Sequence, residues 1–206
     1  MNSKKIFIIR HGQTELNRLG IVQGSGVDSS LNESGRMQAE AFYQAYRDIP
    51  FGHVFTSALK RSQESVESFL NPGIRHTILP GLNEISWGEK EGKRMTSEED
   101  AYYKGILSDW RQGKTFLRIE GGESPEEVVE RLKPAVEVIR QVEEENILVC
   151  MHGRALRILL CYLLQEPLRN MDDFDHSNLC LYLLQQKEEG FLLIKRNDTS
   201  HLSSLK

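Results

Sequence analysis

The sequence predicts an α/β fold, a three-layer sandwich with a mostly parallel central sheet and helices on both faces. Short apolar, β-branched runs alternate along the chain with segments whose apolar residues recur at helical spacing. Such alternation is typical of parallel strands joined by crossover helices. The chain has 206 residues, so we expect one domain over residues 1–206 with a helical insertion at about 85–122.

The first part of the chain is expected to supply three strands and two helices. A helix begins near Asn32, a residue type favoured at the N-cap, and Asn71-Pro72-Gly73 ends the next helix. The strands are predicted at residues 5–9, 53–55 and 75–79, and the second helix at residues 60–70.

The second part begins with the insertion, a polar, glycine-containing stretch expected to place one or two helices over a cleft. Its aromatic residues could line a substrate pocket, but packing within the insertion is the favoured interpretation: Trp87, Tyr102, Tyr103 and Trp110. Ser124-Pro125-Glu126-Glu127 is a capping box with proline at the first helical position, so a helix begins there. A strand at 147–151 and a leucine-rich helix follow, and a hairpin over 180–194 adds antiparallel pairing at one edge.

Composition limits the classes of partner. The net charge is −4, and general nucleic-acid binding needs a basic face. No segment approaches the length of a membrane span, and the apolar part of the N-terminal run is too short for a signal peptide. The three cysteines lie in apolar runs without CxxC spacing, which favours buried free thiols. We therefore expect a cytoplasmic protein without nucleic-acid or membrane partners.

Two histidines occupy equivalent positions in this plan. His11 and His152 each follow an apolar strand and precede a glycine. Ligands of open α/β sheets bind beyond the carboxyl ends of the strands, where both would lie. Arg10, Arg61 and Glu84 also follow strands, so five groups converge on one edge. Arginine binds phosphate through two parallel hydrogen bonds, and the set predicts an anion site with a titratable carboxylate beside it.

Ordered motifs running nearly end to end resemble the histidine phosphatase superfamily, the phosphoglycerate mutase-like enzymes. They are Arg10-His11-Gly12-Gln13-Thr14-Glu15 with Asn17 and Gln23-Gly24, Ser30 to Gly35 with Gln38-Ala39, Thr56 to Gln63, Leu82-Asn83-Glu84-Ile85, Gly122-Glu123-Ser124 and His152-Gly153. A bare Arg-His-Gly is a weak signal, whereas this series in the family's order is specific.

The resemblance implies a role for each group. His11 would attack phosphorus and carry the phosphoryl group, and Glu84 would act as general acid and base. Arg10, Arg61 and His152 would hold the phosphoryl oxygens, so that neither a metal nor a cofactor is needed. The expected substrate-binding residues are Asn17, Gln23, Gly24, Gly153 and Asn178, although a loop-structural role for Gln23 and a turn role for Asn178 fit equally well.

The favoured function is a metal-independent phosphatase, of the histidine acid phosphatase type, acting on a small phosphorylated metabolite. A cofactor-dependent phosphoglycerate mutase is the alternative, but the chain is compact after Glu84 and lacks a Tyr-Tyr-Gly motif there. A non-catalytic phospholigand-binding module ranks third, because His11 and Glu84 are both present. Arg154 stands where relatives often have a small residue, and it either adds charge to the pocket or caps a surface helix. Neither the substrate nor the oligomeric state follows from the sequence.

Overall fold

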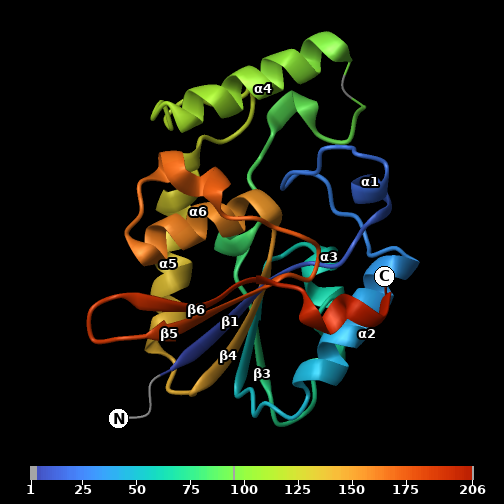
Figure 1. The fold of residues 1–206 in the computed structure, drawn as a ribbon, viewed down its shortest axis with the longest axis vertical. Coiled ribbons are helices and arrows are strands. Elements are labelled where there is room, and N and C mark those ends of the chain that lie inside the picture. Colours follow the sequence, from blue (N-terminus) through green and yellow to red (C-terminus); the bar gives the residue numbers. More distant parts are fainter. Residues whose placement is uncertain (1–3, 95, 206) are drawn as a thin grey trace.

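A six-stranded sheet organises the computed structural model, which describes residues 4–94 and 96–205 (Figure 1). The strand order is β3-β2-β4-β1-β5-β6, and the first four strands in this order run parallel. The two remaining strands form the predicted antiparallel edge. The strands are β1 (Lys5–Arg10), β2 (His53–Thr56), β3 (Arg75–Ile78), β4 (Asn146–Met151), β5 (Leu181–Gln186) and β6 (Phe191–Asp198).

The two faces of the sheet bury two separate cores, because side chains alternate along each strand. Ile6 and Ile8 of β1 point into one core, and Phe7 and Ile9 point into the other. This continuous apolar run is what a strand covered on both faces requires. The predicted layered α/β architecture is confirmed.

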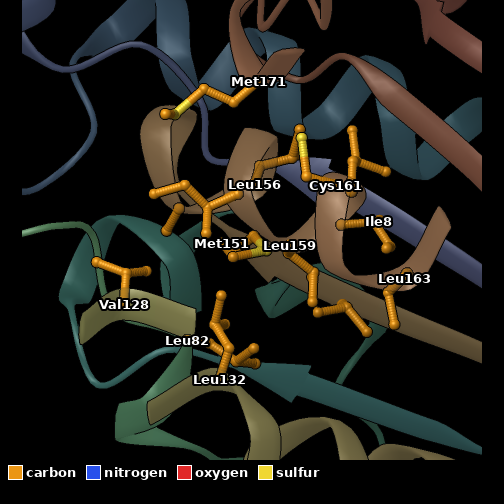
Figure 2. Close-up of a cluster of buried hydrophobic side chains, with 14 of the residues drawn as sticks. Ile8, Leu82, Val128, Leu132, Met151, Leu156, Leu159, Cys161, Leu163 and Met171 are labelled. Carbon is orange, nitrogen blue, oxygen red and sulfur yellow. The ribbon is translucent and has the colours of Figure 1, made fainter. Parts of the chain in front are cut away.

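Helices cover both faces. The first core is closed by α5 (Pro125–Gln141) and α6 (Gly153–Leu164), whose packing against the sheet is seen in Figure 2. The second core is closed by α2 (Glu33–Tyr46) with the short helices η1 (Glu67–Phe69) and η5 (Ser200–Leu205). The predicted caps are present, since Asn32 accepts from Gly35 N and Ser124 forms a capping box with Glu127.

The helix predicted over residues 60–70 is wrong in its second half. The helix α3 (Lys60–Glu64) ends after five residues and a turn leads into η1. The Ser65 hydroxyl donates to Arg61 O at 2.6 Å and accepts from Gly12 N at 2.9 Å. A serine bound to its own helix and to a distant loop favours a bend over a further helical turn.

The segment over residues 85–122 carries η3 (Gly88–Lys90) and one long helix, α4 (Ser97–Arg111), which lies beyond the end of the sheet in Figure 1. Trp110 of α4 is fully buried and stacks on Trp87, with ring centroids 5.7 Å apart. The remaining short elements are α1 (Glu15–Arg18), η2 (Pro80–Leu82) and η4 (Leu168–Asp173). None of the helices in the described ranges is long and apolar enough to cross a membrane.

Candidate active site

The site begins where β1 and β4 end side by side. Arg10 pairs with Met151 in the parallel register, so the next residues, His11 and His152, leave the sheet together. Their ring centroids are 5.1 Å apart. The topology of the sheet thus brings together two histidines separated by most of the chain.

The ring of His11 is buried and held in one orientation. Its Nδ1 lies 2.7 Å from the carbonyl oxygen of Gly12. A carbonyl only accepts hydrogen bonds, so Nδ1 carries the proton and Nε2 is the free nitrogen of the neutral ring. Burial, and then the charges of Arg61 and Arg10, hold the pKa of His11 well below its usual range.

Three buried nitrogen atoms around this ring have no partner among the described residues: the donors Arg10 Nε and Arg61 Nε, and His152 Nδ1, which is a donor when the ring accepts from Ser57 through Nε2. The rest of each guanidinium is fixed by carbonyl oxygens, since Arg10 Nη1 donates to His176 O and Arg61 Nη1 to Val27 O, both at 2.6 Å. Buried donors without partners are costly. Three of them beside one histidine indicate a site that an anion completes.

His152 is fully buried, and its Nε2 lies 2.7 Å from the hydroxyl of Ser57. Burial lowers the pKa of His152 well below its usual range, and the positive charge of Arg61 acts in the same direction. The ring is therefore neutral at physiological pH and offers one N–H group as a donor.

Glu84 is held at the N-terminus of α6. Its carboxylate accepts from Arg154 N at 3.1 Å and Ala155 N at 2.8 Å, and from its neighbour Ile85 N at 3.0 Å. Arg131 of α5 fixes the backbone of this turn, donating to Glu84 O at 3.0 Å and pairing with Glu123. The carboxylate nevertheless lines the cleft, where it can reach a bound molecule.

A cleft of about 160 Å³ lies over these groups. Of the residues predicted from the sequence, those that line it are Arg10, His11, Asn17, Gln23, Glu84 and Gly153. Arg61 and His152 are fully buried and do not line it. Both are nevertheless close to His11, because the charge of Arg61 lowers the pKa of His11 and a charge on His11 would lower the pKa of His152.

Three of the predicted substrate-binding residues have other contacts. Gly24 does not line the cleft, and its carbonyl oxygen accepts from Arg61 Nη2 at 3.2 Å. The amide of Gln23 is engaged by Thr14 and Ser29 within its own loop. Asn178 Nδ2 donates to His11 O at 3.1 Å and to Asn17 Oδ1 at 3.3 Å. Asn178 therefore fixes the side chain of Asn17 through a hydrogen bond.

The fold brings to the site four residues that the sequence did not assign to it. Trp87 and Tyr103, expected to pack within the insertion, line the cleft, although Trp87 also packs on Trp110. His176 lines the cleft and lies 3.3 Å from Arg10 Nη1. Ser57 contacts His152 as described, and its place directly after a strand was a signal that could have found it.

The sheet and the cluster at its carboxyl edge define an α/β protein with two histidines, two arginines and a glutamate gathered at one cleft. The model of the histidine phosphatase superfamily (branch 1) matches residues 6–199, and the chain belongs to this superfamily. The resemblance seen in the motifs is confirmed.

Relatives match the chain over nearly its whole length. A protein of Hydrogenobacter thermophilus named putative phosphoserine phosphatase 2 is 26% identical over 203 residues, or 98% of this chain and 99% of that protein. A probable phosphoglycerate mutase of Erwinia tasmaniensis is 27% identical over 208 residues, or 96% and 94% of the two chains. The crystal structure of the alpha-ribazole phosphatase from Shigella flexneri has a TM-score of 0.83 at 25% identity, covering 94% of this chain and 96% of that one.

Proposed function

We propose that the protein is a phosphatase that hydrolyses a small phosphomonoester through a phosphohistidine on His11. One observation carries this proposal: His11 Nδ1 is committed to the Gly12 carbonyl while the low pKa of the ring keeps Nε2 unprotonated. A neutral, oriented imidazole beside unpaired cationic donors is suited to attack on phosphorus.

The first step transfers the phosphoryl group. His11 Nε2 forms a bond to phosphorus as the bond to the ester oxygen breaks, and the Glu84 carboxyl group gives its proton to that oxygen. Arg10 Nε, Arg61 Nε and His152 Nδ1–H donate to the phosphoryl oxygens, which satisfies the three unpaired donors. Asn17, held by Asn178, is placed to donate a further hydrogen bond.

The second step reverses the roles. The Glu84 carboxylate takes a proton from water, the oxygen attacks phosphorus, and the nitrogen–phosphorus bond breaks to release phosphate and free His11. The arginines supply the positive charge throughout, so the proposed reaction needs no added metal.

The test is release of phosphate from p-nitrophenyl phosphate without added metal. His11→Ala should abolish turnover and the acid-labile phosphoryl label. Glu84→Gln should slow turnover while inorganic phosphate still binds, because it alters proton transfer and leaves the anion donors in place. Activity of His11→Ala near that of the wild type would refute the covalent mechanism.

The mutase alternative draws support from the Erwinia relative and its name. A mutase would interconvert phosphoglycerates in the presence of a bisphosphate primer faster than it releases phosphate. Measuring both rates on the same preparation separates the two functions, and binding without either rate would favour the non-catalytic module.

A further inference from the structure

Arg154 is a buried arginine on the wall of the cleft that the proposed reaction does not use. The residue lines the cleft, and its side chain is only 7% exposed. Its backbone N–H donates a hydrogen bond to Glu84, so Arg154 is in direct contact with the residue that would protonate the leaving group. Burying a charged side chain costs free energy, so a buried arginine at a cleft indicates a role in binding.

Three side chains fix the orientation of the Arg154 guanidinium. Its Nη1 donates to Asp172 Oδ1 at 2.5 Å. Its central carbon lies 5.6 Å from the ring of Trp110 and 6.0 Å from that of Trp87. Cation–π contact with desolvated indoles stabilises the charge and keeps the planar group in one position. The side chain is therefore preorganised at the cleft rather than extended into solvent.

The local charges do not balance within the described residues. Asp172 Oδ1 also accepts from Arg157 Nη1 at 2.5 Å, so one carboxylate serves two guanidinium groups. Asp175 acts on Arg157 from a longer range and forms no ion pair with either arginine in this part of the chain. Of this pair only Arg154 lines the cleft, so the surplus positive charge faces a bound ligand.

The position of Arg154 corresponds to the leaving group rather than to the phosphoryl group. The charges that act most strongly on His11 are Arg61 and Arg10. Arg154 acts instead on Tyr103, which shares the same wall of the cleft. Glu84 acts electrostatically on Arg10 and Arg61 and also on Tyr103, so its carboxylate is within reach of both sets of charges.

We infer that Arg154 binds a second anionic group on the leaving group, a carboxylate or a phosphate, and selects doubly anionic phosphomonoesters as substrates. This inference rests on the proposed phosphatase activity. Asp172 occupies one of the five N–H groups of the guanidinium, and the planar fork of the remaining groups fits either anion with two hydrogen bonds. The substrate class is thus a short phosphomonoester whose carbon chain ends in an acid.

The test compares substrates that differ only in the second anion. Glycerol 3-phosphate has a hydroxymethyl group where 3-phosphoglycerate has a carboxylate, and glycerol 1,3-bisphosphate carries a second phosphate. We expect the wild-type kcat/KM to favour at least one of the two anionic substrates. Arg154→Gln should lower that preference by about 10- to 100-fold, mainly through KM, as expected for the loss of a charged hydrogen bond. Arg154→Lys should retain part of it, because charge remains while the fork is lost.

Arg157→Gln is the matched control, since it removes an equal charge from the same Asp172 without altering the cleft wall. It should lower the preference between substrates much less than Arg154→Gln does, because Asp172 then pairs with Arg154 alone while the guanidinium of Arg154 stays at the cleft. Equal losses on all three substrates in Arg154→Gln, or an equal loss of preference in Arg157→Gln, would overturn the inference. So would a wild-type enzyme without any preference. If the wild type releases no phosphate even from p-nitrophenyl phosphate, the proposed function itself is wrong.

Discussion

Ser57 should control the tautomer of His152, and its removal gives a sharp test of the anion site. To donate to a phosphoryl oxygen, His152 must carry its proton on Nδ1, so Nε2 must accept from the Ser57 hydroxyl 2.7 Å away. The same hydroxyl lies 2.8 Å from Ser62 Oγ. Ser62 Oγ is also 2.8 Å from Leu59 O, which can only accept. When the Ser62 hydroxyl donates its hydrogen bond to Leu59 O, the Ser57 hydroxyl is free to donate to His152 Nε2.

The magnitude follows from burial. His152 is fully buried, so Ser57→Ala leaves its Nε2 without a partner and without water. An unsatisfied buried acceptor costs about 1–3 kcal/mol, which corresponds to a fall in kcat/KM of roughly 5- to 150-fold. Ser62→Ala, by contrast, removes the competing acceptor for the Ser57 proton, so kcat/KM should stay within about threefold of wild type at most.

The assay is steady-state hydrolysis of p-nitrophenyl phosphate, with affinity for inorganic phosphate measured on the same variants. Ser57→Ala should weaken both, because the lost donor serves the bound anion. Circular dichroism controls for folding. The argument fails if Ser57→Ala remains as active as wild type, or if Ser62→Ala loses as much as Ser57→Ala.

Three further predictions follow from contacts around the site. Arg131→Gln should lower kcat by about tenfold at similar phosphate affinity, because the turn that holds Glu84 loses a charged hydrogen bond; an unchanged kcat would contradict this. Burial and Arg10 hold the pKa of His176 at about 3, so the unfolded state binds more protons below pH of about 6.5. His176 should therefore contribute a fall in the free energy of unfolding of up to about 1.4 kcal/mol per pH unit as the pH drops from that value. In urea titrations at several pH values, the free energy of unfolding of His176→Gln should depend less on pH than that of the wild type, and an equal dependence would refute the buried neutral histidine. Gly35→Ala should destabilise the fold by about 1–3 kcal/mol in the same titration, because the new Cβ would overlap the Gln13 carbonyl; wild-type stability would show that the loop adapts freely.

The parts of the fold that the sequence predicted are those set by local patterns. The apolar run of β1 and the capping box at Ser124 each determine an element whatever the rest of the chain does. The end of α3 was not predictable in this way. It depends on Ser65 contacting Gly12, a residue more than fifty positions away that directly follows β1 and His11 and is brought to Ser65 by the tertiary fold.

The candidate site shows the same division. His11, Glu84 and Arg10 were expected because each follows a strand, and parallel strands end at one edge. His176 follows no strand, and it enters the cleft through the loop before β5. Trp87 and Tyr103 were assigned to packing because aromatic residues in a polar segment usually cover one another. They do pack, at 5.0 Å between ring centroids, but both residues also line the cleft.

The order of the strands explains why this protein needs so few side chains to build an anion site. In the order β2-β4-β1, the residues just after the three strands are Ser57, His152 and His11, which therefore stand in a row. Each contact along the row, Ser57 to His152 and His152 to His11, joins neighbouring strand ends. A displacement of one strand relative to the next would break both the hydrogen bond between Ser57 and His152 and the spacing of the two histidine rings. The alignment of the strands therefore determines the geometry of the site. Substitutions in the core between β2 and β4 should lower activity before they unfold the chain.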